Sequence, residues 1–222
     1  MSNRLARLIT LLAFALCILP AAAQTTFFND LGPAGNLYNP SQGWTVSGTG
    51  TIGTSFTAAN LFTSMATGNV LEIELGVGYV SGTNEFYAAI FTDNNGLPGT
   101  QIYRVDNLSS GIDFGGCCTT IVITPNGLNL VAGQQYFVVL GPENLNSTVF
   151  EAWNWNNQGV NGLDLYSTDG GTSWNSNGTG NPLGALAIIG GGGGTVPEPS
   201  SLLLLGTGLV GACSTLRKKL TR

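Results

Sequence analysis

Residues 70–77 read Val-Leu-Glu-Ile-Glu-Leu-Gly-Val, and this stretch decides the fold class. Its odd-numbered positions are apolar, whereas Glu72 and Glu74 stand at even-numbered positions. Successive side chains of a β-strand point to opposite faces of the sheet. The pattern therefore predicts a strand with one buried face and one face in water.

Short segments of this kind recur along the chain. Further strands are predicted at residues 51–57, 85–92, 101–105, 119–124, 135–140, 149–156, 162–167 and 183–189. Turn-forming sequences rich in Asp, Asn and Gly separate them, at residues 93–99, 124–127 and 169–171. No helical period interrupts the series. We expect an all-β fold, an antiparallel β-sandwich of the jelly-roll type, over residues 24–189.

The composition excludes several classes of function. Of 222 residues, 33 are Gly and only 19 are charged, which argues against a helical bundle. The chain has no His, so it has no Ser-His-Asp triad, Cys-His pair or His-ligated zinc. Between residues 25 and 197, Arg104 stands against eleven acids, a net charge of −10. Such a body repels phosphate backbones, so nucleic acid is not an expected partner.

Residues 1–23 have the three parts of a secretory signal peptide. Arg4 and Arg7 precede an apolar stretch at residues 8–19, and small residues follow at positions 21–23. The small residues Ala21 and Ala23 predict cleavage that leaves Gln24 as the new N-terminus. Signal peptidase and the secretion translocon are therefore expected partners. A short uncleaved membrane anchor is the alternative.

The opposite end carries a second membrane signal. A glycine-rich linker at residues 190–195 leads to Pro197-Glu198-Pro199, an apolar stretch at 202–216, and the basic cluster Arg217, Lys218 and Lys219. A helix of fifteen residues reaches about 22 Å, short of the roughly 30 Å hydrocarbon core. The stretch is thus expected to be a marginal transmembrane helix, with the basic cluster left in the cytoplasm.

The order and spacing of these parts in residues 196–222 resemble a PEP-CTERM sorting signal. The resemblance implies that an exosortase, a membrane-embedded transpeptidase-like protease, recognises Pro197, Glu198 and Pro199. It also implies that the basic cluster holds the tail in the inner membrane until processing. Members of this family are exported proteins of Gram-negative bacteria that make exopolysaccharide. An ordinary tail anchor after a Pro-rich linker is the alternative.

Three segments of the body, at residues 91–99, 132–136 and 153–156, are similar to β-sandwich ectodomains often carried by such proteins. This second resemblance bears on the fold alone.

Residues 167–174 resemble an Asp-box, the hairpin that recurs in sialidase propellers and other β proteins. The resemblance implies that Ser167 and Asp169 bind turn amides, that Gly171 lies in the turn, and that Trp174 packs beneath. A sialidase would need several copies and an arginine cluster, whereas this chain has one copy and one arginine in its body. We therefore expect a structural hairpin.

Trp153 and Trp155 stand two positions apart, so on a strand they share one face. If that face is exposed, the two rings form a platform for a sugar, with Asn154 and Asn156 beside them. If it is buried, the rings close the core, which is the commoner role of such a pair.

An acid pair, an acidic turn and a cysteine pair are also candidate functional sites. Glu72 and Glu74 have a spacing compatible with a glycosidase pair, but the face on which they lie is expected to be solvated. The acidic turn at residues 93–95 lacks the terminal carboxylate of a calcium loop, so we expect a tight turn and no metal. Cys117 and Cys118 have three open states: a vicinal disulfide, two thiols, or bonds to another chain.

Together these features predict a non-enzymatic exported protein that needs no cofactor. It would pass through an inner-membrane intermediate to the cell surface or extracellular matrix. A carbohydrate-binding module for exopolysaccharide is the alternative, and an extracellular glycan hydrolase a remote one.

Overall fold

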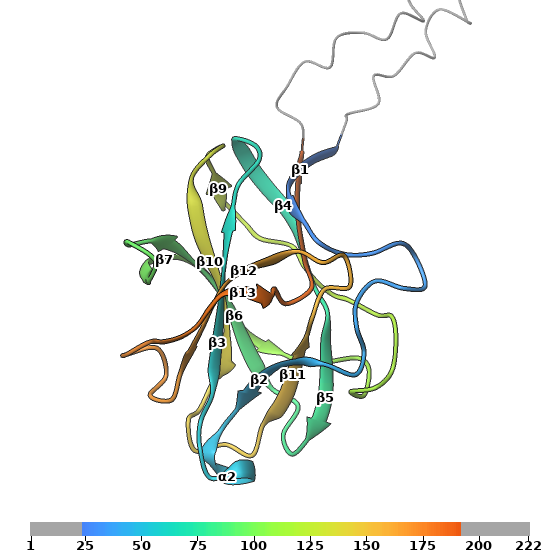
Figure 1. Ribbon diagram of the computed structural model, residues 1–222, viewed down its shortest axis with the longest axis vertical. Helices are drawn as coiled ribbons and strands as arrows, with labels where there is room; N and C mark the ends of the chain where they lie inside the picture. The colour runs from blue at the N-terminus through green and yellow to red at the C-terminus, as the bar shows by residue number, and fades with distance from the viewer. Residues whose placement is uncertain (1–23, 192–222) are drawn as a thin grey trace, which may run out of the picture. The chain divides into compact units, whose positions relative to one another are not determined.

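The computed structural model describes residues 24–191, which form an all-β body (Figure 1). The predicted signal peptide, its cleavage residues Ala21 and Ala23, and the sorting signal at 196–222 with its helix at 202–216 lie outside the described residues. Within residues 24–191, no helix has the length and hydrophobicity needed to cross a bilayer.

The strands of the body pair antiparallel in three sheets. The first has the order β1-β14-β4-β8, with β9 also paired to β4. The second has the order β13-β12-β3-β10-β6-β7, and the third β2-β11-β5. The strand bounds are β1 Gln24–Asn29, β2 Gly43–Ser47, β3 Thr57–Thr63, β4 Gly68–Leu75, β5 Val77–Ser81, β6 Phe86–Asp93, β7 Pro98–Leu108, β8 Ile121–Ile123, β9 Asn129–Leu130, β10 Gln135–Pro142, β11 Phe150–Asn154, β12 Asn161–Ser167, β13 Asn175–Pro182 and β14 Leu186–Gly191.

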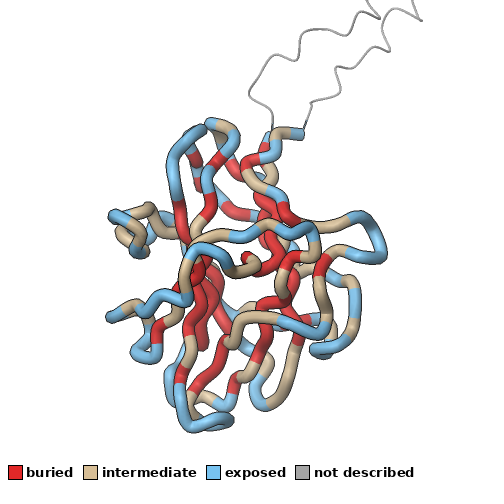
Figure 2. Tube along the Cα trace, in the orientation of Figure 1, coloured by how far each residue is buried: buried red, intermediate tan, exposed pale blue. Residues whose placement is uncertain are grey.

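One hydrophobic core joins the three sheets. Phe27 and Ile188 of the first sheet, Phe86 and Leu140 of the second, and Trp153 of the third all belong to a single buried cluster. Most buried positions lie along the strands, apart from β7 and β13, which have none, and the connections are mostly exposed or half-buried (Figure 2). Antiparallel sheets packed on a common core fit a β-sandwich.

The middle of the second sheet is buried on both faces. Strands β10 and β6 are apolar without alternation, and seven of the eight residues of β10 are buried. One face belongs to the common core, while Ala59, Phe137 and Leu165 belong to a second cluster on the other face. Continuous apolar runs are what strands covered on both sides require.

Strand β4 contains a bulge that the alternation in its sequence does not reveal. Its pairing with β14 passes from Glu72 opposite Ile189 to Val70 opposite Gly190, so Leu71 is the extra residue. As a result Val70 is fully buried and Leu71 is 49% exposed. The expectation that residue 71 faces the core was therefore wrong, because one inserted residue reverses the faces beyond it.

The strand predicted at residues 51–57 is also wrong over most of its length. Residues Thr49–Ile52 form the short helix α2, and β3 begins only at Thr57. Gly53 ends the helix in the left-handed conformation, with φ of 79°, and its N–H donates to the Thr49 carbonyl. A C-terminal glycine of this kind is a common helix stop.

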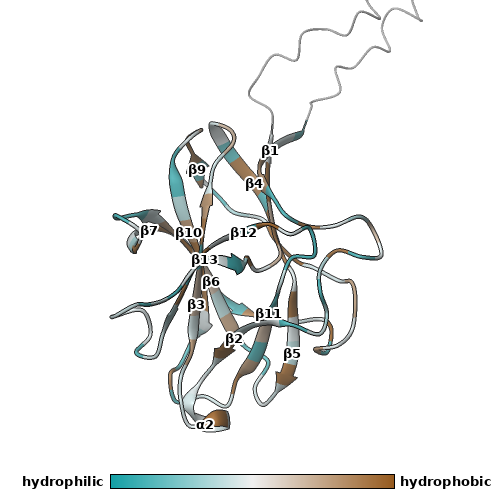
Figure 3. Cartoon of the chain, viewed as in Figure 1, coloured by the Kyte–Doolittle hydropathy of each residue, from teal (hydrophilic) through white to brown (hydrophobic). Residues whose placement is uncertain are grey.

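Strand β13 was not predicted, because it has no apolar face. Its residues are mostly exposed, it pairs only with β12 at the edge of the second sheet, and it is coloured hydrophilic in Figure 3. An edge strand without a buried side shows no alternation in its sequence.

The last strand reaches into the predicted glycine linker. Strand β14 includes Gly190 and Gly191, which pair with Thr25 and Gln24 of β1. A Cβ on Gly190 would lie 3.1 Å from Cζ of Phe27 and closer still to Cε2. The linker boundary at residue 190 is thus corrected to follow Gly191, because Gly190 is needed for close packing rather than for chain freedom.

Candidate functional site

The predicted signal residues divide between the described body and the rest of the chain. Gln24, expected to become the N-terminus, is the first residue of β1 and pairs with Gly191 of β14. The two ends of the body therefore lie side by side at one edge of the first sheet (Figure 1). Pro197, Glu198, Pro199, Arg217, Lys218 and Lys219 lie outside the described residues.

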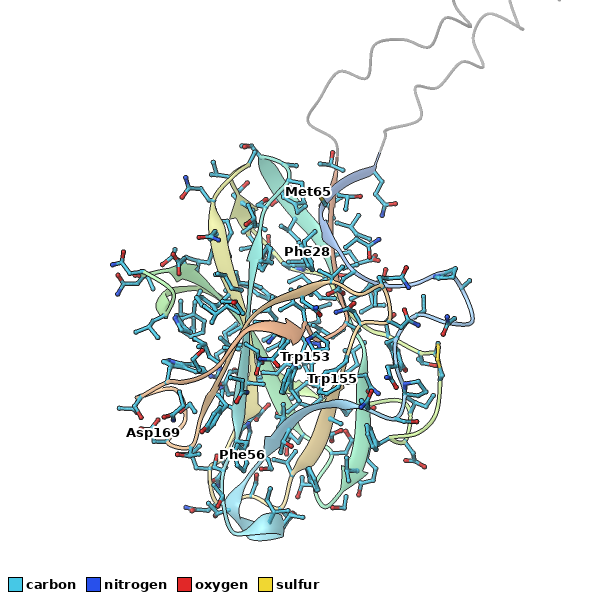
Figure 4. All side chains as sticks on the ribbon, in the orientation of Figure 1. Phe28, Phe56, Met65, Trp153, Trp155 and Asp169 are labelled. Atoms are coloured by element: carbon cyan, nitrogen blue, oxygen red, sulfur yellow. A yellow bond between two sulfur atoms is a disulfide. The ribbon has the colours of Figure 1, made fainter. Side chains whose placement is uncertain are left out.

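Trp153 lies in the core rather than on the surface (Figure 4). Its side chain is fully buried, and its Nε1 donates to the Ala185 carbonyl at 3.1 Å. Trp155 is half-buried and packs on Trp44, with ring centroids 5.1 Å apart at an angle of 52°. The sugar platform of Trp153 and Trp155 therefore does not form, because the Trp153 ring is fully buried and the Trp155 ring packs on Trp44.

The amides beside these tryptophans bind backbone groups. Asn154 Nδ2 donates to the Asn39 carbonyl at 2.9 Å, and Asn156 Nδ2 donates to the carbonyls of Val160 and Leu183. Both residues are buried. Their amides are thus part of the framework and not available to a sugar.

The hairpin at residues 167–174 has the hydrogen bonds of an Asp-box turn. Ser167 Oγ donates to Asp169 Oδ1 at 2.7 Å and accepts from the Gly171 amide at 2.8 Å. The Ser173 amide donates to Asp169 Oδ1 at 2.9 Å. Bonds from Ser167 and Ser173 hold the pKa of the Asp169 carboxyl down at about 2. Trp174 packs against the second hydrophobic cluster, as the resemblance implies.

The other polar features are local. Glu72 and Glu74 are partly exposed, and Thr120 Oγ1 donates to Glu74 Oε2 at 2.8 Å. Asp93 Oδ1 accepts from the Gly96 amide at 2.8 Å, which closes a tight turn.

Of the three states left open for the cysteine pair, the structure has the vicinal disulfide between Cys117 and Cys118. Residues 24–191 bring together no group of three metal-ligating side chains.

Three carboxyl groups that the sequence does not single out are buried. Asp30 and Asp164 are each 1% exposed and Glu151 is fully buried. Desolvation raises the pKa of Asp30 and of Glu151 to about 8, and that of Asp164 to about 6. Asp30 Oδ1 accepts from the Leu186 amide at 2.6 Å, whereas neither oxygen of Glu151 has a partner within residues 24–191. No local sequence signal marks these residues, because their burial depends on distant strands.

Asp164 lies at the floor of a cleft of about 450 Å³. Its Oδ1 accepts from Asn60 Nδ2 at 2.6 Å, and its Oδ2 accepts from the Asn177 amide group. The cleft is formed by β2, by β3 with the residue before it, by β12 with the residue after it, and by β13. Its lining residues are Trp44, Thr45, Phe56, Ala58, Asp164, Leu165, Tyr166, Thr168 and Asn177.

The aromatic rings of the cleft are held in pairs. Phe56 packs on Tyr166, with centroids 6.1 Å apart, and Trp44 packs on Trp155. Trp44 is also fixed by its Nε1, which donates to the Pro182 carbonyl at 2.9 Å. Phe56 lies away from Trp153, toward the end of the body that carries α2 (Figure 4). The rings of Trp44, Phe56 and Tyr166 are all partly exposed, so they present apolar surface to the cleft.

Comparison with known families identifies the tail. Residues 195–219 match the PEP-CTERM protein-sorting motif, which covers the predicted Pro197, Glu198 and Pro199 and the basic cluster. No curated protein and no solved structure matches the chain. The motif implies processing by an exosortase and export through the membrane to the cell surface.

Proposed function

We propose that this chain is a non-enzymatic protein of the cell surface or extracellular matrix, delivered and processed through its PEP-CTERM tail. The observation that carries the proposal is the match of residues 195–219 to the sorting motif. A leader at residues 1–23 would direct the chain to the translocon, and signal peptidase would cleave before Gln24. The apolar stretch at 202–216 would then hold the tail transiently in the inner membrane, where the exosortase acts.

The β-rich body supports a role outside the cell. Its antiparallel sheets fit a β-sandwich ectodomain, and a vicinal disulfide is compatible with an oxidising compartment. Because its two ends pair in β1 and β14, removal of both signals would leave a body whose terminal strands are held in a sheet.

The carboxyl groups support a non-enzymatic body. Glycoside hydrolysis ordinarily uses two carboxyls that flank one bond. Among the residues that line the 450 Å³ cleft, Asp164 alone carries a carboxyl. Glu72 and Glu74 lie on the partly exposed face of β4 and do not line this cleft.

Intact-mass measurement tests the proposal. The full chain is expressed in a host with its exosortase and in the same host without that enzyme. We expect the mature protein to begin at Gln24 and to lack the residues after Pro199 in the first host, and to retain the tail in the second. A protein that still ends at Arg222 in both hosts would refute processing and leave the tail as an anchor.

A further inference from the structure

We propose that the cleft over Asp164 binds an uncharged pyranose sugar, a function that goes beyond sorting through the tail. The site is distinct from the tryptophan pair at 153 and 155, since neither residue lines the cleft: Trp153 is buried in the core and Trp155 packs behind Trp44. It is assembled from β2, β3, β12 and β13, and its residues are far apart in the sequence.

The aromatic rings supply a preformed apolar surface. Trp44 is fixed on two sides, by its packing on Trp155 and by its hydrogen bond to the Pro182 carbonyl. Phe56 and Tyr166 brace each other across 6.1 Å. A pyranose has one face of C–H groups, and covering these rings with that face removes apolar surface from water. Since the rings are already ordered, a ligand would lose little affinity to ordering them.

A polar floor and rim supply hydrogen bonds for sugar hydroxyls. Asp164 is 1% exposed and is positioned by Asn60, whose Oδ1 in turn accepts from the Gly184 amide at 2.6 Å. An ionised carboxylate has about four acceptor positions, and the two amides use two of them. Thr45, Tyr166 and Thr168 also line the cleft, and within residues 24–191 their hydroxyls have no hydrogen-bond partner. These groups can pair with the hydroxyls along the edge of a sugar.

The charge and the volume of the cleft further restrict the chemical class of its ligand. The only acid or base that lines the cleft is Asp164, and the body carries a net charge of −10 between residues 25 and 197. Uronic acids, sulfated sugars and phosphates would therefore be repelled. A purely apolar ligand would cover the hydroxyls of Thr45, Tyr166 and Thr168 without replacing their bonds to water. The cleft volume lies in the range of about 300–1,000 Å³ for small-molecule sites, which suits one or two sugar rings.

A quaternary ammonium ligand is the main competitor, since aromatic rings and a carboxylate also attract such a cation. It has no hydrogen-bonding edge, so it would leave Thr45, Tyr166, Thr168 and Asn177 without partners on the ligand. The several polar groups around the rings favour the sugar.

The test measures binding to the exported protein purified from its host. Calorimetry and tryptophan fluorescence are recorded with neutral monosaccharides and disaccharides, glucuronic acid, and tetramethylammonium, each at millimolar concentration. We expect saturable binding of at least one neutral sugar and none of glucuronic acid. The Trp44→Phe variant should lose the fluorescence response and bind more weakly in calorimetry, because the reporting indole and its hydrogen bond to the Pro182 carbonyl are both removed.

Substitutions inside and outside the cleft test whether the sugar binds there. We expect Trp44→Ala and Asn177→Ala to weaken binding about 10-fold or more, a change of about 1.4 kcal/mol. Asn177 is exposed, so its variant should remain folded even if Trp44→Ala does not. Phe114→Ala removes an aromatic ring that is 37% exposed and does not line the cleft, and it should bind as the parent does.

The results can overturn the proposal. No saturable binding by any neutral sugar of the panel refutes it, and binding of tetramethylammonium alone assigns the cleft to a cation. Sugar binding that the folded Asn177→Ala variant retains in full places the ligand elsewhere. None of these results bears on tail processing, which the mass measurement decides separately.

Discussion

Gly184 lies directly against the indole ring of Trp153. A Cβ on Gly184 would be 2.6 Å from Nε1 of Trp153 and closer still to the ring carbons. The two residues are thirty-one positions apart, and the Ala185 carbonyl that follows the glycine accepts the indole N–H. The absence of a side chain at position 184 therefore lets the largest residue of the core reach its hydrogen-bond partner.

Gly184→Ala should destabilise the protein, because the methyl group has no room beside a ring that is fully buried. Overpacking of this kind costs about 1–3 kcal/mol. Chemical denaturation monitored by tryptophan fluorescence measures the loss. The control is Gly111→Ala, since a Cβ at Gly111 meets no atom within 4 Å. Equal stability of the two variants would contradict the close packing of Gly184 against the Trp153 ring.

Gly190→Ala tests whether the glycine run begins inside the fold. The new methyl group would overlap the Phe27 ring and the Asn69 carbonyl, so we expect a stability loss of about 1–3 kcal/mol. The comparison is Gly180→Ala in the edge strand β13, where a Cβ meets nothing within 4 Å. If Gly190→Ala melts at the temperature of the parent, residue 190 belongs to the linker after all.

Stability should fall as the pH rises from about 4 to 8. The pKa values of Asp30 and Glu151 are raised to about 8 and that of Asp164 to about 6, whereas their ordinary values are 3.8 and 4.5. In this window the folded state binds more protons than the unfolded state, so the free energy of unfolding decreases with pH. Each such group contributes up to about 1.4 kcal/mol per pH unit. Thermal melts at pH 5 and pH 8 should show the higher melting temperature at pH 5.

The variant Glu151→Gln should reduce this pH dependence, because it removes a carboxyl that titrates in the window. The exposed Glu85→Gln provides the matched control and should leave the slope unchanged. A parent protein that is more stable at pH 8 than at pH 5 would show that these carboxyls are ionised in the fold.

Asp169→Ala should lower the melting temperature and loosen the hairpin, because the Ser173 amide and the Ser167 hydroxyl lose their acceptor. The low pKa of Asp169, about 2, means that this contribution is complete above pH 4 and is lost as the pH falls through 2. Asp113→Ala replaces an exposed carboxylate and is the control. Hydrogen exchange of the amides of Gly171 and Ser173 measures the loosening, and unchanged protection would remove the structural role.

Replacing Arg217, Lys218 and Lys219 with Gln should leave unprocessed precursor in a host with an exosortase. A short apolar stretch without flanking positive charge is a poor stop in the membrane. The control is the charge-preserving triple variant Arg217→Lys, Lys218→Arg and Lys219→Arg, which should be processed normally. Immunoblots of cell and medium fractions report both, and equal processing of the two triple variants would show that charge is not what retains the tail.

Within residues 24–191, local sequence patterns predict some features correctly and fail where distant strands decide the outcome. The alternation at residues 70–77 predicted a strand, but the bulge at Leu71 depends on its pairing with β14, a segment more than a hundred residues away. Trp153 and Trp155 were expected to share a face of one strand, but β11 ends at Asn154, and only the neighbouring strands decide that Trp153 is buried while Trp155 is half-buried. The hairpin at Asp169 was predictable because its hydrogen bonds join residues within four positions of one another.

The amino-acid sequence by itself determined the all-β class, the polar turns and the sorting motif, since each is a property of neighbouring residues. Alternation, turn chemistry and a motif of about 25 residues can be recognised without knowing what lies opposite them. Only the tertiary structure decided which carboxyls are buried, why Gly184 and Gly190 carry no side chain, and where Trp44, Phe56, Tyr166 and Asp164 meet in one cleft. The physical reason is that burial and cleft formation depend on contacts between strands distant in the chain, and these exist only after the sheets have packed.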